Sequence, residues 1–136
     1  MATGIYAPQI KIYDTSELSL KCLRGLDSEV IKFKILSDDY KKIVMAQHDR
    51  TIDFHAQYGA HYKTRIPHYP RDLEYNPICA NLCISASANE IYRLSLEEGK
   101  FLIPFHTDSF INSMHFNDKL NVLVCGGDEV EIWDFR

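Results

Sequence analysis

The sequence has few of the features that mark catalytic, secreted or membrane proteins. It contains only six glycines, and it lacks a Gly-rich phosphate loop, a Gly-x-Ser-x-Gly nucleophile motif and a His-Glu-x-x-His zinc motif. Its apolar runs, such as residues 43–46 and 122–125, are too short to span a bilayer, and the first residues do not form a signal peptide. These absences favour a soluble, intracellular, non-enzymatic protein without cofactors.

Cysteine is scarce as well. Four cysteines in 136 residues are too few for a disulfide-dense scaffold. No second Cys or His pair at zinc-finger spacing accompanies Cys79 and Cys83. We therefore expect no metal site and interpret the cysteines as buried free thiols in strands. None of the six histidines lies in a metal-binding pattern, and we expect His68 to lie at the surface.

The charge and apolar content indicate one globular domain without a broadly basic surface. The net charge is −4, so most of the surface is not suited to nucleic acid. With 46% apolar and 12% aromatic residues, the chain can form a hydrophobic core.

Helical periodicity is also absent, and a different repeat takes its place. Four short strand-like runs carry an aromatic residue near their ends, and these aromatics recur at nearly even intervals along the chain: Tyr13, Phe54, Tyr92 and Trp133. Asp134 completes one Trp-Asp pair. An interval of about 40 residues between strand-like segments is typical of β-propeller blades.

Other positions support the same repeat. Val44, Ile84 and Val124 are evenly spaced at the same interval and lie in short apolar runs. Alternating or continuous apolar patterns predict strands at 31–35, 43–46, 51–55, 62–66, 73–75, 82–86, 90–94, 101–105, 111–116, 122–125 and 129–133. The predicted fold is all-β: a partial WD-repeat β-propeller of about three four-stranded antiparallel blades, with repeats at 14–54, 55–92 and 93–133.

The phase of the repeat gives a further expectation. Residues 2–4 resemble the end of a second strand, and Arg136 comes just after a third strand. We therefore expect a segment of a larger propeller, because closed propellers have about four to eight blades. Open blade edges could also let such a segment self-associate.

Longer stretches resemble one family closely. They are Ala-Thr-Gly-Ile-Tyr-Ala-Pro-Gln-Ile-Lys-Ile-Tyr-Asp (2–14), Ile-Leu-Ser-Asp-Asp-Tyr (35–40), Tyr-Lys-Thr-Arg-Ile-Pro (62–67) and Glu-Ile-Tyr-Arg-Leu (90–94). This succession resembles the WD-repeat region of the nucleolar protein 10 family, called essential nuclear protein 2 in fungi. The resemblance covers essentially the whole chain.

The resemblance implies a scaffold of ribosome biogenesis in the nucleolus. It implies a component of the small-subunit processome that supports maturation of small-subunit ribosomal RNA without enzymatic activity. The expected partners are other ribosome-assembly proteins, and direct contact with precursor ribosomal RNA is left open; no membrane or small-molecule substrate is expected. Because Phe54 and Tyr92 replace the usual Trp, we expect the buried Asp-His-Ser/Thr-Trp network of WD repeats to be missing in the middle blades.

One local charge pattern suggests a contact site. Four basic residues are interleaved with Tyr62, Pro67 and Tyr69, and they are Lys63, Arg65, His68 and Arg71. Cations beside aromatics could bind a phosphate backbone or an acidic partner segment. The alternative is a solvated outer strand whose basic residues protect its edge.

A second motif gives an alternative function. Residues 133–136 read Trp-Asp-Phe-Arg, a pattern that some WD-repeat substrate receptors of cullin–RING ubiquitin ligases use. The structural explanation is a well-formed third strand in which Asp134 and Arg136 stabilise the blade. A generic interaction scaffold also stays open.

Overall fold

The computed structural model describes residues 8–26, 28–36, 42–56 and 59–135. These residues form fourteen β-strands and no helix, so no described helix could cross a membrane. All strand pairs are antiparallel. The all-β prediction is confirmed. The expectations at residues 2–4 and at Arg136 fall outside the described residues.

The strands form four sheets in chain order. The first contains β1 (Gln9–Asp14) and β2 (Ser19–Gly25). The second runs in the order β3 (Val30–Ile35), β4 (Ile43–Gln47), β5 (Thr51–Ala56) and β6 (Gly59–Arg65). The third contains β7 (Pro70–Asn76), β8 (Asn81–Ala86) and β9 (Glu90–Ser95), with β10 (Lys100–Phe101) and β11 (Phe105–His106) both paired to β9. The fourth contains β12 (Ser113–Asn117), β13 (Val122–Gly126) and β14 (Val130–Asp134).

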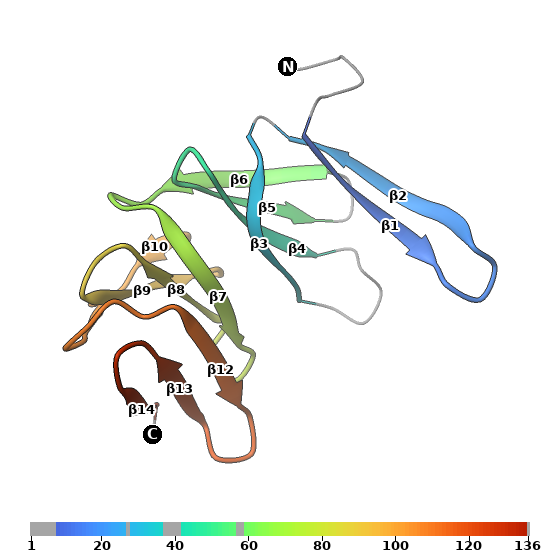
Figure 1. Ribbon diagram of the computed structural model, residues 1–136. Coiled ribbons are helices and arrows are strands. Elements are labelled where there is room, and N and C mark those ends of the chain that lie inside the picture. The colour runs from blue at the N-terminus through green and yellow to red at the C-terminus, as the bar shows by residue number, and fades with distance from the viewer. Residues whose placement is uncertain (1–7, 27, 37–41, 57–58, 136) are drawn as a thin grey trace.

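The sheets follow one another in an arc, as successive blades of a propeller do (Figure 1). The first strand of each later sheet lies on the inner side, and β7 contacts both β3 and β12. Apolar side chains fill the space between neighbouring sheets. The largest cluster joins the second and third sheets and includes Val44, Ile84 and Leu94, all fully buried.

The repeat aromatics occupy equivalent strands but different environments. Phe54 on β5 and Tyr92 on β9 are buried, whereas Trp133 on β14 is half-buried. Tyr13 on β1 is 56% exposed. In the second, third and fourth sheets, the strand with the aromatic residue is the third one counted from the inner strand. The first sheet contains only β1 and β2, and Tyr13 lies on β1. The division into repeats 14–54, 55–92 and 93–133 stays a prediction.

The predicted strand at 101–105 is wrong in one respect, because the structure breaks it into β10 and β11. The amide of Leu102 still donates to the carbonyl of Arg93 at 2.8 Å, but Pro104 has no N–H to continue the ladder. The side chain of Arg93 fills the gap and donates from Nε to the Ile103 carbonyl at 3.0 Å. β2 is a strand that the apolar pattern did not predict.

Two buried carboxylates on β7 join the blades near the inner edge. Asp72 accepts the Met114 amide of β12 at 2.7 Å and lies 3.7 Å from Nζ of Lys32 on β3. Glu74, two residues further on, has matching partners on the same two strands. The arc is therefore fixed by polar contacts as well as by its apolar cores.

Candidate interaction surfaces

Lys63 and Arg65 lie together on the outer strand of a blade. Both side chains are exposed on β6, which is the last strand of its sheet. In register they face Asp53 and Thr51 of β5. With Thr51 and Thr64 they line a shallow hollow of about 240 Å³. This position suits either a contact with an anionic partner or protection of the strand edge.

His68 has a structural partner. It is exposed in the loop between β6 and β7, as predicted, and its Nδ1 lies 2.9 Å from the hydroxyl of Tyr92 on β9. This hydrogen bond ties the loop to its blade. Tyr92 stands at the Trp position of the WD-repeat network, so the hydrogen bond between His68 and Tyr92 keeps one contact of that network. The expected loss of the network therefore holds only in part. The buried hydroxyl of Ser85 has no hydrogen-bond partner among the described residues.

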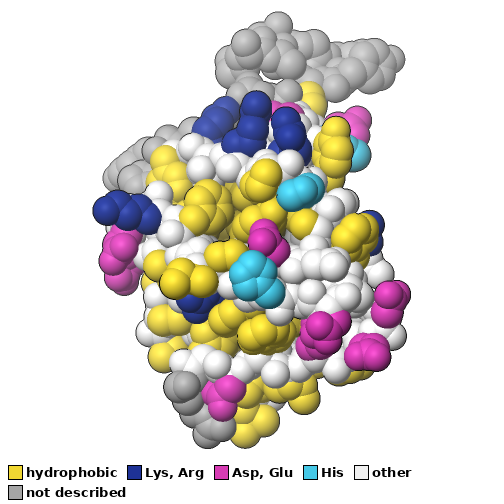
Figure 2. Space-filling model, turned by 90° about the vertical axis from the view of Figure 1, so that its left-hand side faces the viewer, with side chains coloured by type: hydrophobic (Ala, Val, Ile, Leu, Met, Phe, Trp, Pro, Cys, Tyr) yellow, Lys and Arg dark blue, Asp and Glu magenta, His cyan; other side chains and the backbone are white. Residues whose placement is uncertain are grey.

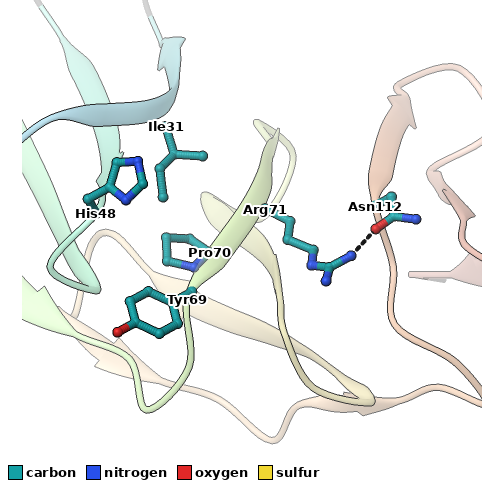
Figure 3. Close-up of a pocket in the computed structure, with 6 residues that line it drawn as sticks. All are labelled: Ile31, His48, Tyr69, Pro70, Arg71 and Asn112. Carbon is teal, nitrogen blue, oxygen red and sulfur yellow. Dashed lines mark hydrogen bonds between the residues drawn. The ribbon is translucent and has the colours of Figure 1, made fainter.

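Arg71 does not share a surface with Lys63 and Arg65, since it lies on β7, the inner strand of the next blade. It reaches toward Asn112, just before β12, and donates from Nη1 to the amide oxygen of that side chain (Figure 3). Its guanidinium carbon also lies 5.4 Å from the ring centre of Phe110. The four predicted contact residues are thus split between an outer strand, a loop and an inner strand.

The structure also shows a hollow that sequence reasoning missed. It has a volume of about 490 Å³ and lies where three inner strands begin (Figure 3). Its lining residues are Ile31, His48, Tyr69, Pro70, Arg71 and Asn112. Arg71 and Asn112 are one repeat length apart in the sequence, so the repeat itself is the signal that could have placed them together.

Tyr69, which lines this hollow, has Arg50 as a basic neighbour. The guanidinium carbon of Arg50, in the turn before β5, lies 6.0 Å from the centre of its ring. The same side chain donates to the Pro67 carbonyl at 3.2 Å, so it is held against the loop before β7. The turn before β5 and the loop before β7 therefore form one continuous surface.

Figure 2 shows the side of the molecule on which the loop between β6 and β7 lies in Figure 1. Basic side chains gather at the upper end of this view, and hydrophobic side chains with histidines cover its centre. Several acidic side chains lie toward the lower right.

A separate acidic hollow of about 180 Å³ is lined by Asp108, Ser109, Asp128, Glu129 and Glu131. The described residues contain no group of three or more His, Cys, Asp or Glu that could hold a metal ion.

Trp133, the first residue of the Trp-Asp pair, contributes to packing between blades. Trp133 stacks on Phe105 with ring centres 4.6 Å apart and an interplanar angle of 7°. The guanidinium carbon of Arg93 lies 4.6 Å from the same Phe105 ring. Asp134 is exposed. Because Arg136 lies outside the described residues, the ligase-receptor interpretation stays a prediction.

The described cysteines differ in accessibility, and the prediction for Cys22 falls outside the described side chains. Cys83 and Cys125 are buried free thiols in strands, as predicted, and burial raises the pKa of each to about 12. The prediction is wrong for Cys79, which is exposed. This residue lies in the turn between β7 and β8, where the chain reverses direction in a few residues and leaves its side chain outside the sheet.

The fold defines a class of protein: a chain of successive β-propeller blades that expose their loops and outer strands. The chain matches the family described as nucleolar protein 10-like, N-terminal domain, over residues 1–136, and it belongs to that family. The resemblance drawn from the sequence is therefore confirmed.

Individual relatives agree with the family match. The chain is 49% identical over 140 residues to Ribosome biogenesis protein ENP2 of Saccharomyces cerevisiae. It is 46% identical over 139 residues to human Nucleolar protein 10, and 46% identical over 146 residues to the ribosome biogenesis protein enp2 homolog of Schizosaccharomyces pombe. All of this chain is covered in each comparison, but it spans only 20%, 20% and 23% of these three relatives, respectively.

Proposed function

We propose that this chain acts in the nucleolus as part of a non-enzymatic scaffold of ribosome biogenesis. The observation that carries the proposal is family membership over the whole chain, with relatives named for ribosome biogenesis and for the nucleolus. Within this role, we assign it to the small-subunit processome, where it supports maturation of small-subunit ribosomal RNA. Its partners are other ribosome-assembly proteins and precursor ribosomal RNA.

The blades support such a role by presenting rigid surfaces rather than by transforming a substrate. Strand pairing and the apolar cores fix the outer strands and loops in place. Lys63 and Arg65 then offer two exposed cations on β6, in a chain whose overall charge is negative. Cations in such a position attract phosphates or acidic protein segments over about one Debye length.

Charge reversal tests this contact. The full-length protein carrying Lys63→Glu and Arg65→Glu should be recovered with pre-ribosomal particles several-fold less well than the unaltered protein. The matched control reverses two exposed lysines elsewhere, Lys100 on β10 and Lys119 in the turn before β13, and should leave recovery unchanged. Undiminished recovery of the first variant would show that β6 is not a contact site.

Affinity purification tests the scaffold role as a whole. The full-length protein should bring down precursor ribosomal RNA and other ribosome-assembly proteins. Recovery of a cullin–RING ligase adaptor in their place would favour the alternative function based on residues 133–136.

A further inference from the structure

Two arginine–aromatic pairs stand at the start of successive inner strands. Arg50 lies against Tyr69, just before β7, and Arg71 lies against Phe110, shortly before β12. Tyr69 and Phe110 are one repeat length apart, so they are equivalent positions in neighbouring blades. We call Arg50, Tyr69, Arg71, Phe110 and Asn112 the loop-side cluster.

Both rings of the loop-side cluster are accessible to a ligand. Tyr69 is 59% exposed and Phe110 is 47% exposed, although each has a cation at one side. The repeat aromatics of these two blades lie deeper: Tyr92 is buried and Trp133 is half-buried. Tyr69 and Phe110 therefore do not serve as core residues of their blades.

Among the described residues, no carboxylate forms an ion pair with either arginine of the cluster. Arg50 contacts a carbonyl oxygen and a ring, and Arg71 contacts an amide oxygen, a hydroxyl and a ring. The carboxylate of Asp49, beside Arg50, accepts the amide of Thr51 at 3.1 Å. Two exposed acidic residues lie near the cluster along the chain: Glu29, whose carbonyl accepts the amide of His48 at 2.9 Å, and Asp108, two residues before Phe110.

We propose that the loop-side cluster is a docking site for single-stranded RNA. Bases stack on the rings of Tyr69 and Phe110, phosphates approach Arg50 and Arg71, and the amide of Asn112 bonds a base edge in the hollow. Exposed rings paired with cations are the elements that bind unpaired nucleotides without sequence preference. This inference rests on the proposed function, because it names the RNA contact of the scaffold.

The exposed rings favour single-stranded RNA over an acidic peptide and over duplex RNA. A peptide carboxylate needs cations but gains little from two flat exposed rings, whereas every base has a face that can stack. Duplex RNA hides those faces inside its helix, so the site should discriminate between single and double strands.

Fluorescence anisotropy with a labelled twelve-nucleotide oligouridine tests the proposal on the full-length protein. The double variant Tyr69→Ala, Phe110→Ala should bind about thirtyfold more weakly or worse, in line with the loss of two stacked bases. Phe101→Ala, which removes a comparably exposed ring on β10, should change the affinity less than about twofold. Thermal melting of each variant checks that the fold is retained.

A second variant keeps the test independent of folding. Arg50→Gln should reduce the slope of log affinity against log salt by about 0.7, the value for one phosphate contact on a single strand. A slope that does not change would overturn the assignment of Arg50.

Other outcomes separate this inference from the scaffold role. Equal affinity of the double variant and the unaltered protein, or no RNA binding by either, overturns the RNA site. Tighter binding of a duplex or of a polyglutamate peptide that competes at the cluster overturns it too. In each case recovery with pre-ribosomal particles is scored separately, and it alone decides the proposed function.

Discussion

Lys34 and Glu74 form an ion pair that joins two neighbouring blades. Their Nζ and Oε1 atoms are 3.0 Å apart, although the residues are separated by 40 positions, the length of one repeat. The other oxygen of the same carboxylate accepts the amide of Phe116 on β12 at 3.4 Å. Glu74 is only 8% exposed, so these partners take the place of the water that its carboxylate loses on burial.

Removal of this carboxylate should destabilise the arc. Glu74→Ala is expected to lower the free energy of unfolding by about 2 kcal/mol, because it leaves the amide of Phe116 without its acceptor and Lys34 without its partner. Urea denaturation measures this loss. Glu98→Ala, in an exposed turn, is the control and should change stability by less than about 0.5 kcal/mol. Equal losses in the two variants would contradict a bridging role.

The stack between Phe105 and Trp133 should be visible by fluorescence, because Trp133 is the only tryptophan of the chain. Phe105→Ala opens one face of the indole to water and should shift its emission to longer wavelength. We also expect a loss of about 2 kcal/mol in stability, less than for a fully buried phenylalanine. Phe101→Ala is the control and should leave the emission unchanged. An unshifted spectrum for Phe105→Ala would show that the stack does not form.

Thiol reactivity should separate the cysteines. At pH 8, a thiol whose pKa is about 12 is a thiolate in roughly one molecule in ten thousand, and thiolate is the reactive form. Cys79 is exposed and should react quickly with a disulfide reagent in the folded protein. Cys83 and Cys125 should react only after denaturation. Rapid labelling of Cys83 and Cys125 in the folded state would contradict their burial.

The same burial predicts a loss of stability at alkaline pH. Burial raises the folded-state pKa of the Cys83 thiol to about 12, above the ordinary value of 9.0. Its contribution to stability is therefore complete below pH 9 and decreases as the pH rises from 9 toward 12, because the unfolded chain then loses its proton first. Melting between pH 8 and 10.5 measures this decrease, which Cys83→Ala should reduce.

Tyr92→Phe tests the link between a loop and its blade. The variant removes the hydroxyl that meets Nδ1 of His68 and should cost about 1 kcal/mol. Amide hydrogen exchange in residues 66–69 should become faster, because the loop loses an anchor. Tyr13→Phe alters an exposed ring and serves as the control. Unchanged exchange in Tyr92→Phe would mean that the hydrogen bond does not hold the loop.

The sequence predicted the strands well where buried strands appear as continuous apolar runs. Val44, Ile84 and Val124, evenly spaced by one repeat length, lie on β4, β8 and β13, the second strands of three sheets. Apolar residues that face two neighbouring sheets leave a continuous run, which can be recognised without knowledge of partners. The break before β11 was not recognisable in the same way, because apolar residues on both sides of Pro104 preserve the strand pattern.

The candidate site was less predictable, because it depends on contacts between blades. Lys63 and Arg71 are near in sequence, but one lies on an outer strand and the other on the inner strand of the next blade. Arg71 finds its partner in Asn112, which belongs to a later repeat. Spacing by one repeat length, rather than closeness along the chain, determines which side chains meet.

The carboxylates of Asp72 and Glu74 have a consequence for solubility. β12 pairs with β13 along one edge, and its other edge presents the amides of Met114 and Phe116, which these carboxylates accept. A bare strand edge is a template on which a second chain can add a strand and begin aggregation. By capping those amides with negative charge, β7 shields its neighbour from such misassembly while the arc is intact.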